Sequence, residues 1–226
     1  MYNIFPSITT TTDSWRQMIV DVNKLGLSEV AIFPTAIGYS QRQELYKLLE
    51  NSSVKHIPLV HIKDDMTREE IIYLSKTFET QKFNIHSQKQ SKFILKNDLS
   101  EFNKMIYLEL TKYKLGDELL NYGGICLDTA HVENQRLRKA SLYDDFMDDL
   151  QGFLVGVAHI NAILPKSRID SWRGGLNYDS HKFTNLSEFD YVINYKAYLP
   201  DTICLELENS IFEQLMAKEY IRKLLV

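Results

Sequence analysis

Short apolar segments recur along this chain, and stretches with helical spacing separate them. The segments are four to eight residues long and rich in Ile, Val, Leu and Phe, which is typical of strands buried on both faces of a parallel sheet. We predict eight such strands, at residues 2–5, 29–33, 57–62, 82–86, 105–110, 124–128, 153–160 and 202–207. No Pro- or Gly-rich linker interrupts the 226 residues, so we expect a single domain over residues 1–226.

The stretches between these segments carry apolar residues at helical spacing. In the first of them one helical face holds Trp15, Met18, Ile19, Val22 and Leu25. Thr67 with Glu70 resembles a capping box, which predicts the start of another helix. Further helical patterns cover residues 40–50, 112–121, 140–150, 185–197 and 210–225, and a weaker one covers 89–103. Eight strands alternating with about eight helices predict an α/β fold, a compact single (β/α)8 TIM-type barrel.

Composition and charge weigh against some classes of protein and indicate where this one resides. A formal net charge of −4 gives no overall basic field, which weighs against a generic nucleic-acid or membrane-surface protein and still allows a local basic lip. The N-terminal residues lack a charged region followed by a long apolar run, so we expect a cytoplasmic protein that does not associate with membranes. Cys126 and Cys204 lie within apolar runs and are expected as buried residues of a reduced protein; a disulfide or a thiolate ligand is the alternative.

Six of the eight predicted strands place a metal-competent side chain at or near their C-terminal ends. These residues are His61, His86, Glu109, Asp128, His159 and Glu206. Active sites of α/β barrels are built at this end of the strands. Burying so many polar and charged groups costs several kcal/mol each unless they are compensated, and a divalent cation bound by carboxylate oxygens and neutral imidazoles compensates them. The pattern therefore predicts a metal-binding pocket at the C-terminal face of the barrel.

Two short motifs extend the predicted pocket. Asp128-Thr129-Ala130-His131 places His131 three residues after a strand-end carboxylate, where the chain can curl both groups toward one ion. Asp179-Ser180-His181 adds a second pair, Asp179 and His181, in a loop opened by Gly174-Gly175 after the seventh strand. His56 precedes its strand, at the opposite end, and is expected as a structural residue.

The ordered set resembles the xylose isomerase-like TIM barrel superfamily, and is most similar to its endonuclease IV branch. That branch binds three metal ions with nine ligands in the order His, His, Glu, D-x-x-H, His, D-x-H, Glu. The resemblance assigns these roles to His61, His86, Glu109, Asp128, His131, His159, Asp179, His181 and Glu206. It implies up to three divalent ions, with Zn or Mn expected first and Fe or Mg as the other choices.

The resemblance also implies a reaction. It indicates a metal-dependent hydrolase of the phosphodiesterase kind, with damaged DNA as substrate and with Glu109 and Glu206 as the catalytic carboxylates. Gln41-Arg42-Gln43 resembles a DNA-contacting segment of the branch. We accordingly expect substrate contacts from Arg42 and from three basic residues that follow the seventh strand, Lys166, Arg168 and Arg173.

The loops around the pocket depart from the endonuclease pattern and keep other functions open. Ser87-Gln88-Lys89-Gln90 replaces the short Gly-Ser-His run that follows the second histidine, and Leu110 replaces an asparagine. One alternative is a sugar or sugar-phosphate isomerase or epimerase with a single Mn or Mg ion, although Phe33-Pro34-Thr35 replaces the catalytic glutamate found there in many such enzymes. Another is a multinuclear iron-dependent oxidase, and a third is a barrel with purely structural metals.

Overall fold

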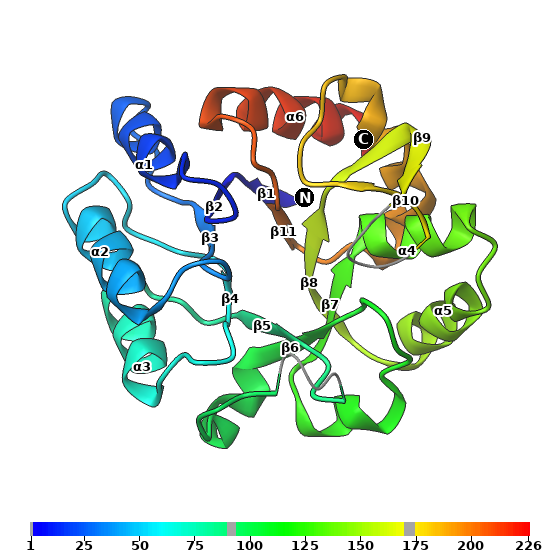
Figure 1. Cartoon of the computed structure of the whole chain (residues 1–226), viewed down its shortest axis with the longest axis horizontal. Helices are drawn as coiled ribbons and strands as arrows, with labels where there is room; N and C mark the ends of the chain where they lie inside the picture. The colour runs from blue at the N-terminus through cyan, green and yellow to red at the C-terminus, as the bar shows by residue number, and fades with distance from the viewer. Residues whose placement is uncertain (1, 90–93, 170–174) are drawn as a thin grey trace.

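The computed structural model describes residues 2–89, 94–169 and 175–226, whose main strands form a barrel ringed by helices (Figure 1). The strands are β1 (Asn3–Phe5), β2 (Ser7–Thr9), β3 (Ala31–Phe33), β4 (Val60–His61), β5 (Phe83–His86), β6 (Ile106–Glu109), β7 (Gly124–Asp128), β8 (Val155–Ile160), β9 (Ala162–Ile169), β10 (Leu176–Ser180) and β11 (Thr202–Leu205). The α-helices are α1 (Trp15–Lys24), α2 (Tyr39–Glu50), α3 (Arg68–Thr77), α4 (Thr129–Leu137), α5 (Leu142–Gly152) and α6 (Ile211–Leu224). The 3₁₀ helices are η1 (Ser100–Met105), η2 (Gly116–Asn121) and η3 (Leu186–Tyr198).

The barrel closes through its first strand, which Pro6 divides into β1 and β2. The parallel sheet runs in the order β1-β11-β8-β7-β6-β5-β4-β3-β2, so β1 pairs with the last strand and β2 pairs with β3. Pro6 has no N–H to donate to a neighbouring strand, but its carbonyl accepts from the N–H of Ala31 over 3.0 Å. The single stretch from residue 3 to residue 9 thus joins both edges of the sheet. The predicted TIM-type α/β barrel is confirmed.

Two layers of apolar side chains stabilise the barrel. Most buried residues lie between the strands and the surrounding helices, and Ile32, Ile125 and Leu127 are among them. A smaller set, formed by Ala31, Phe33, Leu59, Cys126, Val157 and Cys204, takes the alternate positions on the strands and packs together inside the barrel. Both cysteines are buried and free, as expected of core thiols. Because side chains alternate with period two, the residues two positions further along the same strands also face inward.

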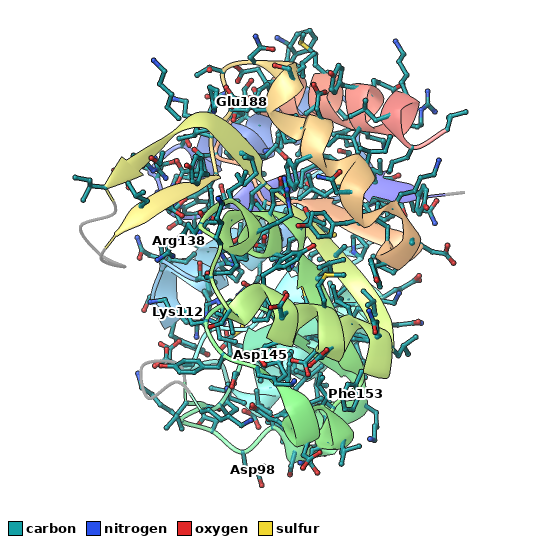
Figure 2. The ribbon with its side chains drawn as sticks, turned by 90° about the vertical axis from the view of Figure 1, so that its right-hand side faces the viewer. Asp98, Lys112, Arg138, Asp145, Phe153 and Glu188 are labelled. Carbon is teal, nitrogen blue, oxygen red and sulfur yellow. The ribbon has the colours of Figure 1, made fainter. Side chains whose placement is uncertain are left out.

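Several elements differ from the sequence prediction. The pattern at 112–121 gives only the 3₁₀ helix η2, which begins at Gly116, whose φ of 53° interrupts a regular helix. Helix α4 was not predicted, because seven consecutive residues from Thr129 to Gln135 are buried and leave no amphipathic pattern. Strands β9 and β10 form an antiparallel hairpin where a loop was expected, and Figure 2 shows this hairpin in yellow, projecting from one side of the barrel.

The predicted capping box at the start of α3 is present. The side chain of Thr67 accepts a hydrogen bond from the backbone N–H of Glu70, and the Glu70 carboxylate accepts from the backbone N–H of Thr67. Over the described ranges of the chain, no helix is both long and apolar enough to cross a bilayer.

Candidate metal centre

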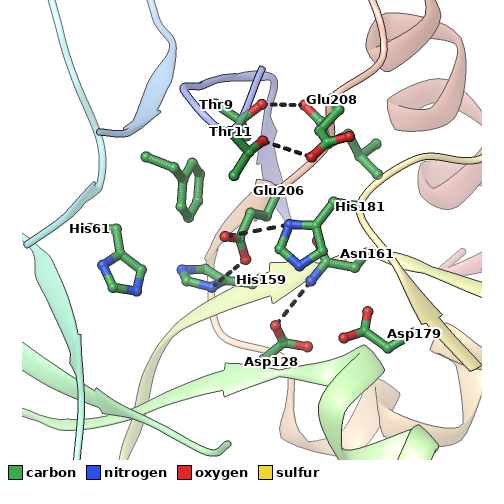
Figure 3. Close-up of polar contacts among 12 residues, drawn as sticks. Thr9, Thr11, His61, Asp128, His159, Asn161, Asp179, His181, Glu206 and Glu208 are labelled. Atoms are coloured by element: carbon green, nitrogen blue, oxygen red, sulfur yellow. Dashed lines mark hydrogen bonds and ion pairs between the residues drawn. The ribbon is translucent and has the colours of Figure 1, made fainter. Parts of the chain in front are cut away.

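The predicted ligands converge at the C-terminal ends of the barrel strands. His61, His86, Glu109, Asp128 and His159 lie on the last or next-to-last positions of β4, β5, β6, β7 and β8. Glu206 directly follows β11, His131 lies in the first turn of α4, and the hairpin brings Asp179 on β10 and His181 directly after it. The structure therefore places all nine residues in one region, part of which is drawn in Figure 3. Their ligation of metal stays a prediction.

Glu109 lies at the centre of this region, and histidines surround both of its oxygens. Oε2 lies 3.2 Å from Nε2 of His61 and 3.7 Å from Nδ1 of His159. Oε1 lies 3.4 Å from Nε2 of His86 and 3.6 Å from Nδ1 of His131. Glu109 also belongs to three groups whose possible ligand atoms lie within 4.8 Å of one another: with His61 and His86, with Asp128 and His131, and with Cys126 and His159. A carboxylate shared in this way can bridge neighbouring ions.

Asp128 and His131 are held together by the start of a helix. Oδ1 of Asp128 accepts a 2.8 Å hydrogen bond from the backbone N–H of His131, so Asp128 is the N-cap of α4 and His131 is the third residue of the helix. This turn brings Nδ1 of His131 to 3.3 Å from Oδ2 of Asp128. The other ring nitrogen, Nε2, lies 3.2 Å from Oδ2 of Asp179 on the hairpin. The turn expected between Asp128 and His131 is thus the first turn of helix α4, with Asp128 as its N-cap.

Glu206, which follows β11, contacts one histidine on β8 and another just after the hairpin strand β10. Its Oε2 lies 3.4 Å from Nδ1 of His159 and its Oε1 lies 3.8 Å from Nδ1 of His181, as Figure 3 shows. Glu206 also forms a group with Asp128 and His159 whose possible ligand atoms lie within 4.8 Å of one another. Two carboxylates, Glu109 and Glu206, therefore face the same imidazole from different strands.

Sequence reasoning missed three residues that hold these side chains. Nδ2 of Asn84 donates to Oε2 of Glu109 over 2.9 Å, and Nδ2 of Asn161 donates to Oδ2 of Asp128 over 3.0 Å. The hydroxyl of Tyr191 donates to the carbonyl of Asn161 over 2.8 Å and fixes the chain just after β8. Asn84 and Asn161 carried a signal, since each is a buried polar residue within an otherwise apolar run.

The electrostatics of the pocket combine burial with dense charge. Burial raises the pKa of Asp128 to about 6, aided by the charges of Asp179 and Glu109 and opposed by His131. Burial would also raise the pKa of Glu206, but His181 and His159 outweigh it and lower the value to about 2.

Glu109 and two of its histidines respond in different ways. Burial disfavours ionised Glu109, yet His86 and His61 hold its pKa well below the ordinary value. Burial lowers the pKa of His86. For His61 burial acts in the same direction, but the hydrogen bond and charge of Glu109 prevail and raise the pKa. Glu109 is thus an ionised carboxylate that is almost fully buried.

The donor set fits divalent cations. Imidazole nitrogens and carboxylate oxygens are the ligands of Zn and Mn, and the four carboxylates of this region, Glu109, Asp128, Asp179 and Glu206, need positive charge to compensate them. Nδ1 of His159 is buried without a hydrogen-bond partner among the described residues, and it faces two carboxylates. An ion between these groups would satisfy this nitrogen and the negative charge together.

The expected substrate contacts divide into three cases. Lys166 and Arg168 are exposed on β9, and Nη2 of Arg168 donates to the backbone carbonyl of Asp179 over 3.0 Å. Arg173 lies outside the described residues. For Arg42 the expected substrate contact is wrong. Its side chain is 0% exposed, and its guanidinium binds the carboxylates of Glu70 and Asp65. Glu70 joins α2 to α3 and Asp65 joins α2 to the loop before α3, so no free guanidinium remains for a phosphate.

His56 lies at the opposite end of the barrel, as expected from its position. Its Nδ1 is 2.9 Å from Oε1 of Glu29, and both residues precede their strands. This pair takes no part in the candidate metal centre.

Comparison with known proteins supports the fold. No protein-family model matches the chain, and no curated protein is similar to it in sequence. Among solved structures, a xylose isomerase-like TIM barrel protein from Mycobacterium smegmatis, in complex with magnesium, is similar with a TM-score of 0.55. The match covers 100% of this chain and 98% of that one, at 13% sequence identity. The chain thus shares the TIM-barrel fold with that protein, and it has possible metal-binding groups at the C-terminal ends of the strands, where α/β barrels carry their active sites.

Proposed function

We propose that this protein is a divalent-metal-dependent hydrolase of phosphodiester bonds, similar to endonuclease IV, with a centre of two or three ions. The observation that supports this most is the position of Glu109, whose two oxygens face different pairs of histidines and which is shared among neighbouring groups of possible ligands. A site for one ion needs no such sharing. Multinuclear centres are typical of enzymes that cleave phosphate esters by in-line displacement.

The proposed ions would be held by the nine residues named above, and when bound they supply Lewis acidity toward phosphoryl oxygens and acidify water. Glu109 and Glu206 keep low pKa values in this pocket, so both are ionised at neutral pH and able to bind cations. Lys166 and Arg168 on the hairpin offer positive charge to a phosphate at the rim. Zn or Mn is the preferred metal, and damaged DNA is the proposed substrate.

A second candidate is a sugar or sugar-phosphate isomerase or epimerase with one Mg or Mn ion. The solved structure from Mycobacterium smegmatis favours it, because that xylose isomerase-like protein is in complex with magnesium. Here Asp128, His159 and Glu206, together with Glu109, would hold the ion, and a glutamate would move the proton.

Metal analysis and activity together separate the two candidates. The protein is purified without added metal, and its metal content is measured by mass spectrometry beside its rate on an abasic-site DNA duplex and on bis(p-nitrophenyl) phosphate. We expect about two or three ions per chain and phosphodiester hydrolysis that a chelator abolishes. A stoichiometry near one ion, with inertness toward both phosphodiesters and turnover of aldose or ketose phosphates, would reject the hydrolase in favour of the isomerase.

A further inference from the structure

The imidazole of His159 separates the candidate metal centre from the inside of the barrel. Its Nδ1 faces the centre, 3.4 Å from Oε2 of Glu206 and 3.7 Å from Oε2 of Glu109. Its Nε2 points the other way, to Sγ of Cys126 at 3.3 Å. Among the described residues this thiol is the one hydrogen-bond partner of Nε2. The two ring nitrogens thus have different neighbours, one charged and one neutral.

The surroundings bury this arrangement on all sides. His159 and Cys126 are both 0% exposed, and Cys126 belongs to the apolar layer inside the barrel. The ring of Phe33 packs against the imidazole edge to face, with ring centroids 4.9 Å apart. Cys126 is a fully buried thiol, which behaves as a small S–H group in the apolar layer.

The chemistry of imidazole links these two sides. A neutral imidazole carries one N–H and one lone pair, and a nitrogen that binds a metal must present its lone pair. If Nδ1 binds an ion, the proton must be on Nε2, where a buried N–H needs an acceptor. Histidine ligands of metals ordinarily donate their second N–H to a carboxylate, a carbonyl or water, which fixes the tautomer and the ring orientation. At His159 the atom placed to accept this second N–H is Sγ of Cys126.

We propose that Cys126 is a positioning residue, which accepts a hydrogen bond from Nε2–H of His159 and so presents Nδ1 to an ion shared with Glu206. The inference rests on the metal centre of the proposed function. Asn84 and Asn161 support it by analogy within the same site, because they hold Glu109 and Asp128 through neutral groups as well. A neutral acceptor adds no further negative charge to a region that already contains several carboxylates.

Serine and alanine at position 126 separate this role from simple packing. Cys126→Ser keeps a small acceptor, whereas Cys126→Ala removes it. Cys204→Ala is the matched control, since Cys204 is equally buried in the same apolar layer and pairs with His159 only through the backbone register of β11 and β8. Each variant is checked for folding by circular dichroism, and Zn²⁺ alone is the probe, titrated against a chromophoric chelator.

For Cys126→Ala we expect Zn²⁺ affinity to fall about tenfold or more, while Cys126→Ser and Cys204→Ala retain the affinity of the natural chain. In the Zn²⁺-loaded natural chain, ¹⁵N NMR of the histidine rings should show the proton of His159 on Nε2. Unchanged affinity in Cys126→Ala, or an equal loss in Cys204→Ala, would overturn the proposal.

A direct thiolate ligand is the alternative that Co²⁺ detects. If Cys126 bound the ion itself, the Co²⁺-loaded protein would show a strong sulfur-to-cobalt absorption band that Cys126→Ser abolishes, and this too would overturn the positioning role. We expect no such band. These measurements report on metal binding alone, so inertness on every phosphodiester would reject the proposed reaction and leave the role of Cys126 to be decided by the Zn²⁺ data.

Discussion

Nδ2 of Asn161 donates a 3.0 Å hydrogen bond to Oδ2 of Asp128, and this bond joins the residue after β8 to the last residue of β7 in the candidate metal centre. The carboxylate it holds is the one whose pKa burial raises to about 6. Asp128 therefore changes charge in a range accessible to experiment, and it must be ionised to bind a cation.

Metal affinity should depend on the ionisation of Asp128. We expect the affinity for Zn²⁺ or Mn²⁺ to fall as pH decreases through about 6, by about tenfold per pH unit for each proton that must be displaced. Titrations between pH 5 and 8 measure this, with Asp128→Asn as the comparison. A flat profile for the natural chain would contradict the assignment of Asp128 as a ligand.

The same pKa predicts the opposite trend for the metal-free protein. The folded state binds a proton on Asp128 more tightly than the unfolded chain does, because the ordinary value is 3.8 and the folded value is about 6. The contribution of Asp128 to the free energy of unfolding is thus largest below pH 4 and is lost as pH rises through 6. Urea unfolding of chelator-treated protein should show this loss, and Asp128→Asn should remove it.

Glu109→Gln should lower the number of bound ions by at least one per chain. The amide keeps the size of the side chain but lacks the charge shared among the surrounding histidines, His61, His86, His131 and His159. Native mass spectrometry counts the ions. Glu188→Gln is the matched control, because Glu188 is also buried but is bound to Thr184, and it belongs to none of the possible metal groups of the described residues. Full metal content in Glu109→Gln would refute a bridging role.

Glu206→Gln should lower phosphodiester hydrolysis by about 100-fold or more while the barrel stays folded. The reason is that its ionised carboxylate faces both His159 and His181 in the candidate metal centre, and a neutral amide would lack the negative charge that binds a cation there. Glu208→Gln is the control on the same loop, since Oε1 of Glu208 accepts from the hydroxyl of Thr11. Rates measured at saturating metal decide the matter, and survival of activity in Glu206→Gln would remove the central role given to this residue.

Lys166→Met should raise KM for a DNA substrate without changing metal content. Lys166 is an exposed cation on the hairpin that also carries Asp179. Phosphate contacts of this kind weaken as salt increases, so the difference from the natural chain should shrink at high ionic strength. Lys55→Met serves as the control, because Lys55 is exposed beside His56 at the far end of the barrel. Equal KM values for the natural chain and Lys166→Met would exclude the contact.

Arg42→Met should destabilise the fold by about 3–5 kcal/mol, because it leaves the carboxylate of Glu70 buried without its partner. Adding Glu70→Gln should recover part of the loss, since the amide is neutral and can still accept from the N–H of Thr67. Urea denaturation measures both. Metal content should stay at the level of the natural chain. A large loss of metal or of DNA binding in a folded Arg42→Met protein would instead restore the substrate contact expected from the sequence.

The sequence by itself determined the class of fold and the order of the polar residues along the strands. Apolar runs of strand length alternating with helical patterns indicate a parallel α/β barrel, and side chains such as Glu109 at the strand ends must meet at one face of it. The period of two also explains why Cys126 and Asp128 share the inner surface. These properties follow from local spacing.

Only the tertiary structure decided how the side chains pair. Arg42 lies in a helical segment rich in polar residues, yet Glu70 of α3 and Asp65 of the loop before α3 bind its guanidinium in the interior. The hairpin of β9 and β10 brings Asp179 to His131, and Glu109 becomes the centre because histidines from four other elements approach it. Such contacts join residues far apart in the chain, and burial and charge act on them only once the barrel has closed.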